Sequence, residues 1–179
     1  GSSRRIKTLD IGGGLIPEKL IPGEISKMQE YTSNLRRMCP ELWEFELITE
    51  FGQWNYFHTG YAISKIEYSI LKGTKYITYI HIGADFLLRD SYVKPRGILF
   101  EALDSNAKSK TTDTVIHDIA GPLCFAGDYL VKNIDLPYLE EGDLLILAGT
   151  GSNSYGLWSR HCSRSIALFF KVDFKNKKV

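Results

Sequence analysis

The first 52 residues show two short apolar runs separated by one amphipathic segment. The runs IKTLDIGG (residues 6–13) and FELITEFG (residues 45–52) have the length and composition of buried strands. Between them, PGEISKMQEYTSNLRRMCP (residues 22–40) places apolar side chains near one face at helical spacing, and Pro40 is expected to end this helix. The order of strand, helix and strand predicts a βαβ unit, in which the two strands run parallel.

After Gly52 the pattern changes to a series of short runs rich in Ile, Tyr, Phe and Val, separated by polar turns. No long helical pattern interrupts them, so this part predicts an antiparallel β-sandwich or barrel domain. The predicted strands lie within YAISKIEYSIL (61–71), KYITYIHIGAD (75–85), GILFEAL (97–103), DTVIHDIAG (113–121), DLLILAG (143–149) and SIALFFKVDF (165–174).

These patterns predict a mainly β chain with two parts, residues 1–54 and residues 55–179. A βαβ unit by itself cannot bury both faces of a two-stranded parallel sheet. The first part is therefore expected to be the last βαβ units of a truncated (β/α)8 barrel. Residues 1–5, GSSRR, have the composition of an added leader and are excluded from the fold prediction.

Composition narrows the range of functions. The 179 residues are 44% hydrophobic and 24% charged, which is typical of a chain that forms a packed core. The net charge of +1 provides no large basic field, so nucleic acid is not an expected partner. No apolar run has the length of a membrane span and no signal peptide is visible, so we expect a cytoplasmic protein with no membrane partner.

Cysteine and histidine usage argues against a metal site. The three cysteines, Cys39, Cys124 and Cys162, are widely spaced and are expected to be reduced thiols. Only His161 and Cys162 are adjacent, and as expected strand residues they would point to opposite faces. We therefore predict no bound metal.

The stretch LDIGGGLIP places three consecutive glycines directly after the first predicted strand. Three glycines are entropically costly to order, so a chain that keeps them needs positive φ angles or a close approach of its backbone. Two interpretations are open: a loop whose bare N–H groups hold a phosphate, or a tight turn without a ligand.

The order of several motifs adds a resemblance. LDIGGGLIP, TEFGQ, HIGADFLLRDSY, GPLCFAGD, LEEGDLLIL and GTGSNSYGLWSRHCSR follow one another as in the fold type III, alanine-racemase-like decarboxylases that depend on pyridoxal phosphate. This family acts on ornithine, diaminopimelate and arginine, and the resemblance covers Ile6 to Phe174. It implies a (β/α)8 barrel that binds the cofactor, followed by a β-domain, of which this chain would hold the last barrel units and the β-domain.

The resemblance also implies site residues. Gly12, Gly13 and Gly14 would bind the cofactor phosphate, with Gly52 close by, and Glu50 would pair with the pyridine nitrogen and keep the ring able to accept electrons. Cys124 would be catalytic, delivering a proton within the active site of a partner subunit. For Glu50 a salt-bridged strand end, and for Cys124 an inert small apolar side chain, are the alternatives.

Several positions depart from the family pattern. Gln53 stands where an arginine of the family binds the phosphate, and this change removes a cationic anchor from the cofactor site. Asn153 stands where a tyrosine of the family is expected. For substrate binding, Arg89 matches an arginine of the family and Tyr92 falls one residue early. Phe125 replaces the glutamate that reads the distal amino group of diaminopimelate, which favours an apolar or bulkier substrate side chain.

The lysine that links to the cofactor lies, in this family, in the first half of the barrel, which the sequence does not contain. Lys65, Lys72, Lys75 and Lys94 all follow the glycine loop and are expected to be solvated charges. We expect the chain to hold pyridoxal phosphate weakly or not at all by itself, and to act as part of a decarboxylase. Two alternatives are one half of a split enzyme with a separate lysine-bearing chain, and a non-catalytic module for oligomerisation or regulation. A homodimer, or association with the missing barrel half, is the expected assembly.

Overall fold

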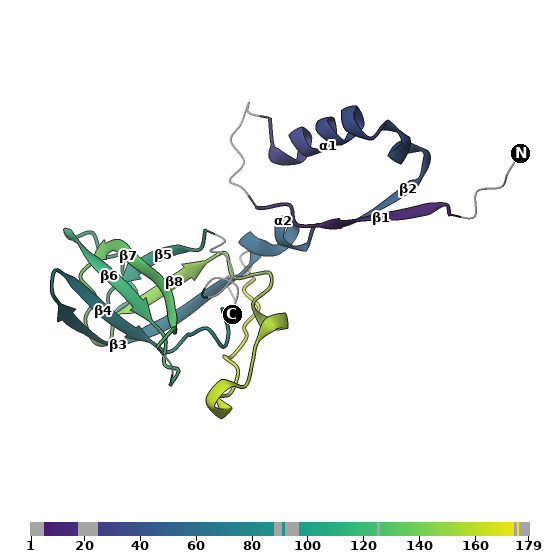
Figure 1. Ribbon diagram of the computed structural model, residues 1–179. Coiled ribbons are helices and arrows are strands. Elements are labelled where there is room, and N and C mark those ends of the chain that lie inside the picture. The colour runs from purple at the N-terminus through teal and green to yellow at the C-terminus, as the bar shows by residue number, and fades with distance from the viewer. Residues whose placement is uncertain are drawn as a thin grey trace, which may run out of the picture.

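The computed structural model describes residues 6–17, 25–87, 91, 97–124, 126–173 and 175. Figure 1 shows a two-stranded sheet with one long helix and, beyond a short connection, a larger sheet that curls on itself. The fold prediction of a mainly β chain with a β-barrel-like part after a βαβ unit is confirmed.

The βαβ unit consists of β1 (Thr8–Gly13), α1 (Lys27–Met38) and β2 (Glu46–Glu50), and β1 pairs with β2 in parallel. Helix α1 starts later than the predicted segment. Its N-cap is Ser26, whose hydroxyl accepts the backbone N–H of Gln29, while the Gln29 side chain accepts the N–H of Ser26. This capping box satisfies two backbone donors at the helix start and is a stronger signal than the Pro-Gly pair upstream, which lies outside the described residues.

A short 3-10 helix (Pro40–Glu44) precedes β2, and α2 (Gly52–Tyr56) with a second 3-10 turn (Phe57–Thr59) follows it. Helix α2 was not predicted from the sequence, because five residues are too few to show the spacing of apolar side chains that marks a helix.

The larger sheet contains six described strands in the order β5-β8-β3-β4-β6-β7. Their bounds are β3 Tyr61–Lys72, β4 Lys75–Ile80, β5 Leu99–Leu103, β6 Thr114–Ala120, β7 Tyr129–Pro137 and β8 Leu144–Ala148. β4 and β6 pair in parallel, and the other neighbouring pairs are antiparallel, so the sheet is mixed rather than purely antiparallel as predicted. Residues Ile66, Ile80, Ile119, Leu145 and Leu147 are at most 2% exposed and form the centre of its core.

Two features of the predicted strands need correction. β7 was not predicted, because YLVKNIDLP mixes polar and apolar residues without clean alternation. Of the strand predicted at 165–174, residues 165–172 belong to no strand, and Leu168 and Phe170 are 84% and 69% exposed. A strand needs a neighbouring edge to satisfy its backbone groups, and β propensity alone does not supply one. His161–Ser163 is a 3-10 turn, so His161 and Cys162 are not strand residues either.

No helix in the described part of the chain is both long enough and apolar enough to cross a membrane.

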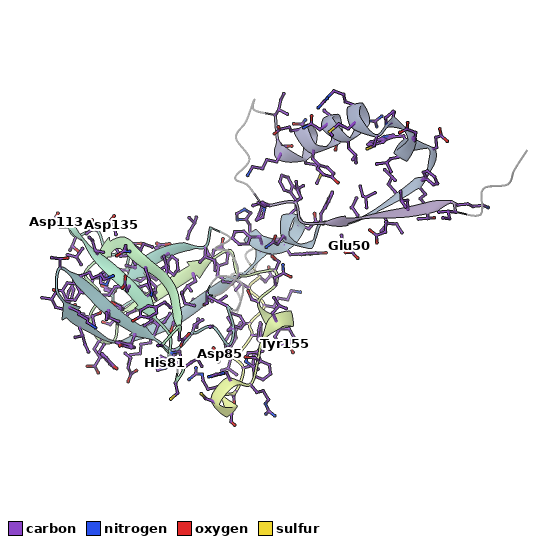
Figure 2. The ribbon with its side chains drawn as sticks, in the orientation of Figure 1. Glu50, His81, Asp85, Asp113, Asp135 and Tyr155 are labelled. Atoms are coloured by element: carbon purple, nitrogen blue, oxygen red, sulfur yellow. The ribbon has the colours of Figure 1, made fainter. Side chains whose placement is uncertain are left out.

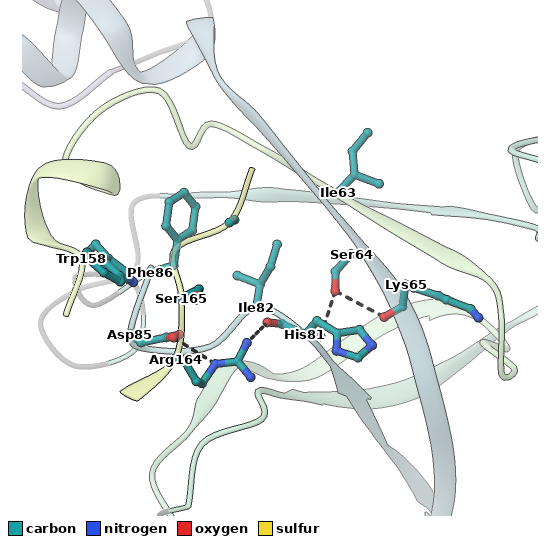
Figure 3. A pocket seen from close by; sticks show the side chains of 11 residues that line it. Ile63, Ser64, Lys65, His81, Ile82, Asp85, Phe86, Trp158, Arg164 and Ser165 are labelled. Atoms are coloured by element: carbon teal, nitrogen blue, oxygen red, sulfur yellow. Dashed lines mark hydrogen bonds and ion pairs between the residues drawn. The ribbon is translucent and has the colours of Figure 1, made fainter. Parts of the chain in front are cut away.

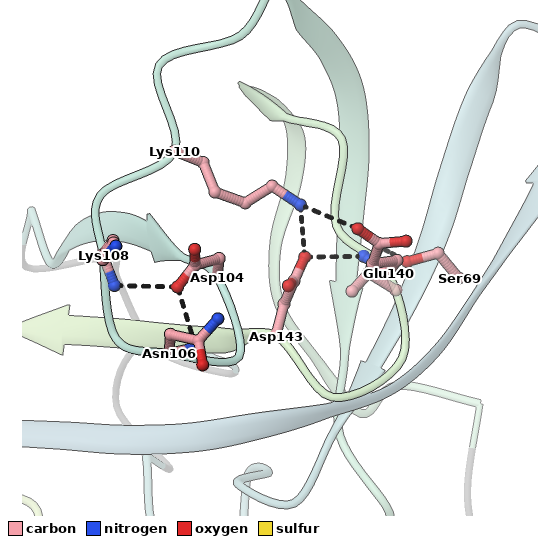
Figure 4. A network of polar contacts seen from close by, with 8 residues as sticks. Ser69, Asp104, Asn106, Lys108, Lys110, Glu140 and Asp143 are labelled. Carbon is pink, nitrogen blue, oxygen red and sulfur yellow. Dashed lines mark hydrogen bonds and ion pairs between the residues drawn. The ribbon is translucent and has the colours of Figure 1, made fainter.

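An ion-pair network joins two connections of the larger sheet (Figure 4). The Lys110 ammonium lies 2.5 Å from a carboxylate oxygen of Asp143, which is 3% exposed and also accepts the backbone N–H of Glu140. Upstream of Lys110, the Asp104 carboxylate accepts hydrogen bonds from the backbone N–H groups of Asn106 and Lys108. These bonds order the loop that leads to Lys110. The Lys110 pKa is raised: burial is the largest single influence and would lower it, but the hydrogen bonds and charges of Asp143 and Glu140 together outweigh burial.

We expect Lys110→Met to lower the free energy of unfolding by about 3 kcal/mol, because it leaves the Asp143 charge buried without its counter-ion. Lys108→Met, in the same loop but at an exposed side chain, is the matched control and should change stability by less than about 0.5 kcal/mol. Urea unfolding of the two variants measures the difference, and equal losses would contradict the assignment.

A buried histidine adds a pH dependence to the fold. His117 on β6 is fully buried, its Nδ1 lies 2.8 Å from the Thr78 hydroxyl, and that hydroxyl is 2.8 Å from the one of Ser69. Burial lowers the pKa of His117 from its ordinary value of 6.5. In the unfolded chain this side chain takes up a proton below about pH 6.5, whereas the folded chain resists protonation at the same pH.

The thermal midpoint should therefore fall as the pH is lowered through 6.5, until the pH reaches the depressed pKa of the folded state. His117→Gln should be less stable at pH 7.5 but show a shallower decline between pH 7 and 5.5 in a thermal melt series. His58→Gln, at an exposed histidine, should keep the slope of the unmodified chain. Equal slopes for all three proteins would refute the assignment.

Candidate cofactor site

The glycine triplet lies at the carboxyl end of β1, beside the carboxyl end of β2. In the parallel register Gly13 stands opposite Glu50, and a Cβ on Gly13 would collide with the Glu50 carbonyl oxygen. Gly12 and Gly14 have φ angles of +71° and +94°, and no described atom beyond their chain neighbours lies within 4 Å of where their Cβ atoms would be. The bend therefore approaches β2 closely on one side and is open on the other.

Part of the hydrogen-bonding capacity of the bend is used internally. The N–H of Gly12 donates to the Asp10 side chain over 2.8 Å, which forms an Asx-type turn. Among the described residues, no side chain occupies the positions where Cβ atoms on Gly12 and Gly14 would lie, and the role of the bend in binding a phosphate stays a prediction.

Glu50 is the last residue of β2 and is exposed, and Figure 2 shows it at the junction between the βαβ unit and the larger sheet. Gly52 and Gln53 follow directly as the first residues of α2. The structure thus brings the glycine triplet, Glu50, Gly52 and Gln53 to one end of the two-stranded sheet, as expected for ligand-binding positions at the carboxyl ends of barrel strands.

The loop after β8, which carries Asn153, packs on the segment after α2. The N–H groups of Gly149 and Thr150 donate to the Gly60 carbonyl at 3.1 and 3.0 Å, and the N–H of Gly151 donates to the Phe57 carbonyl at 3.2 Å. Asn153 is exposed and has a φ of +54°. These contacts place the Asn153 loop close in space to the helix that begins with Gly52 and Gln53, although about a hundred residues separate them in sequence.

Cys124 belongs to a different group of loops. It is exposed and lies between β6 and β7, in a loop that a buried carboxylate, Asp128, joins to the loop after β4. The sequence analysis placed Cys124 in the active site of a partner subunit, and this role stays a prediction. Arg89, Tyr92 and Phe125 lie outside the described residues, so their substrate-binding roles also stay predictions.

A cavity of about 250 Å³ lies between the loop after β4 and the segment near the C-terminus (Figure 3). Asp85, which is 5% exposed, accepts the Arg164 Nε–H over 3.2 Å, and the Arg164 Nη2 donates to the His81 carbonyl over 2.7 Å. The Ser159 N–H donates to the Asp85 carbonyl. The pair fastens the segment after Asn153 to the end of β4, and Figure 2 shows His81, Asp85 and Tyr155 at the same end of the sheet.

Sequence reasoning missed the Asp85–Arg164 pair. For Asp128 it predicted a structural role that orders its own loop, but not the contact with Ala84 in the loop after β4. Asp85 and Arg164 are separated by 79 positions, and no local pattern links them. All three residues lie in motifs that carry the family resemblance: Asp85 in HIGADFLLRDSY, Asp128 in GPLCFAGD and Arg164 in GTGSNSYGLWSRHCSR.

The described part of the chain contains no group of three or more His, Cys, Asp or Glu side chains that could hold a metal ion.

A comparison with protein families matches residues 45–151, from before β2 to just past β8, to the family described as "Pyridoxal-dependent decarboxylase, C-terminal sheet domain". Among curated relatives, the chain is 25% identical over 168 residues to a diaminopimelate decarboxylase of Aquifex aeolicus, covering 94% of this chain and 39% of the relative. It is 28% identical over 172 residues to the diaminopimelate decarboxylase of Vibrio cholerae, with the same two coverages.

Solved structures agree on the fold. AQ1208 from Aquifex aeolicus superposes with a TM-score of 0.71 at 25% identity, over 89% of this chain and 38% of that one. The Paramecium bursaria Chlorella virus arginine decarboxylase bound to agmatine gives a TM-score of 0.69 at 20% identity, over 86% of this chain and 41% of that one. The chain thus spans about two fifths of the length of these relatives. Because the matched region takes in every described strand except β1, this chain belongs to the pyridoxal-dependent decarboxylase family and contains its C-terminal sheet domain.

Proposed function

We propose that this chain is the C-terminal part of a pyridoxal-phosphate-dependent decarboxylase that removes the α-carboxylate of an amino acid. The observation that carries the proposal is the open glycine bend at the carboxyl end of β1, held against the strand that ends in Glu50, in a chain of this family. In this proposal residues 1–54 complete a barrel whose first half lies outside the chain, and residues 55–179 form the sheet domain.

Residues of the bend and of α2 would hold the cofactor. The backbone of Gly12, Gly13 and Gly14 would surround the phosphate, and Gln53 and Asn153 would add neutral side-chain donors near it. The cofactor ring supplies an electron sink for the bond that breaks when carbon dioxide leaves. Glu50 would accept a hydrogen bond from the protonated pyridine nitrogen and keep that proton in place.

The remaining assigned residues would act on the substrate. Cys124 would deliver a proton to the carbon that has lost its carboxylate, in the active site of the partner subunit of a homodimer. Arg89 would bind a substrate carboxylate, with Tyr92 close to it in sequence. Phe125 in place of an acidic residue favours an apolar or bulky substrate side chain over the charged distal end of diaminopimelate.

The first experiment tests whether this chain contains the lysine that links to the cofactor. The 179-residue chain mixed with pyridoxal phosphate should show no absorbance band of a lysine-linked cofactor and no label after borohydride reduction. Assembly with a lysine-bearing barrel half should restore both, together with release of carbon dioxide from an amino acid. Glu50→Gln in that assembly should retain the cofactor but lose about 10²-fold in turnover. Cofactor binding without any decarboxylation would favour the non-catalytic module, and a borohydride label on this chain alone would refute the lysine assignment.

The phosphate assignment is tested by restoring a cation. Gln53→Arg should tighten the binding of pyridoxal phosphate about tenfold, because an arginine adds a charge-assisted hydrogen bond to the phosphate. Asn55→Arg adds the same charge to the same short helix at an exposed position and is the matched control. Fluorescence titration of the assembled protein measures both, and equal effects of the two substitutions would show attraction by charge alone rather than a site at Gln53.

A further inference from the structure

Asp128 is the last residue of the loop between β6 and β7, and its carboxylate is buried. The residue is 3% exposed. One carboxylate oxygen accepts the backbone N–H of Ala84 over 2.7 Å, and the other accepts the N–H of Leu123 over 2.7 Å. Hydrogen bonds from neutral donors to an ionised acceptor are among the strong ones in proteins, and here they span two loops.

The parallel pairing of β4 and β6 explains why these loops meet. In parallel strands the carboxyl ends lie at the same edge of the sheet, and Tyr79 near the end of β4 stands opposite Ala120 at the end of β6. The loops 81–87 and 121–128 therefore leave the sheet side by side.

The backbones of the two loops touch without side chains between them. A Cβ on Gly121 would come within 2.5 Å of the Gly83 Cα and would collide with the Asp128 carboxylate. A Cβ on Gly83 would lie 2.7 Å from the same carboxylate. Glycine at both positions is what leaves room for the Asp128 side chain, so the three residues form one unit.

Leu123, whose N–H the carboxylate holds, directly precedes Cys124, whose side chain is exposed. We propose that Asp128 is a positioning residue: its carboxylate fastens the loop 121–128 to the loop after β4 and thereby holds the Cys124 thiol in place. The thiol part of this inference rests on the proposed function, in which Cys124 delivers a proton, whereas the fastening part stands on the geometry alone.

An aspartate is required at this position. Asparagine has the same shape but only one acceptor oxygen, so its amide N–H₂ would face one of the two backbone donors and leave it unpaired in a buried site. Asp128→Asn is therefore the sharpest variant. Asp113→Asn, at an exposed aspartate before β6, is its matched control.

The first readout is the exchange of backbone amides, followed by NMR in the 179-residue chain. In Asp128→Asn the Ala84 and Leu123 amides should exchange about tenfold faster or more, and their proton resonances should move upfield, while amides in β3 and β8 stay protected. Gly83→Ala and Gly121→Ala should have the same effect because a methyl group displaces the carboxylate. Gly156→Ala, which meets open space, should not. If the Ala84 and Leu123 amides of Asp128→Asn exchanged as slowly as in the unmodified chain, the proposal would be overturned.

The second readout is kinetic and uses the assembled decarboxylase. Asp128→Asn should lower kcat about tenfold with KM within about twofold, and Cys124→Ala should lower it as well. In the double variant the losses should not add, because Asp128 acts through Cys124. Full additivity would overturn the positioning role even if the amides respond. If the assembled protein had no decarboxylase activity, the proposed function would be refuted, and so would the role of the Cys124 thiol. The amide exchange experiment would then still test whether Asp128 fastens the two loops.

Discussion

The arrangement of the functional loops depends on backbones that touch where no side chain fits. Gly13 lies against the Glu50 carbonyl, the Gly60 backbone lies against that of Gly151, and Gly121 lies against Gly83. Each contact joins segments that are distant in sequence. Because the backbone is the least adjustable part of a protein, such contacts fix the relative position of two loops more tightly than contacts between flexible side chains. The candidate site is consequently built from segments that the larger sheet holds at defined distances.

Buried carboxylates also fix the relative positions of loops, at places where no glycine contact does so. The Asp128 carboxylate accepts hydrogen bonds from backbone N–H groups, Asp143 is paired with Lys110, and Asp85 is paired with Arg164. Each carboxylate connects at least two loops, and each would be costly to bury without its partners. These pairs are thus better regarded as devices that specify how the loops meet than as large net contributions to stability. The Asp85–Arg164 pair matters most for the segment after Asn153, since none of residues 154–172 belongs to a strand that could anchor it.

The electrostatics of the proposed cofactor site depend chiefly on Gln53, which stands where the family resemblance implies an arginine. In the proposed site Gln53 and Asn153, the side chains assigned to the phosphate, are both neutral. A phosphate would then be bound chiefly by dipoles, that is, by backbone N–H groups and amide side chains, which bind it more weakly than a guanidinium does. In the function proposed above, the site is completed by a barrel half outside this chain, which spans about two fifths of the length of its relatives.

The sequence by itself determined the local elements and the order of the motifs. The βαβ unit, most of the strands and the position of the glycine triplet at a strand end follow from periodicity and turn residues, which act over a few positions. Only the tertiary structure decided the parallel pairing of β4 with β6, the inclusion of β7, and the absence of a strand at residues 165–172. These features depend on which edges are available for pairing, and Arg164, the partner of Asp85, and Ala84, one partner of Asp128, likewise lie tens of residues away. No local pattern encodes such contacts, because they arise from the register of the whole sheet.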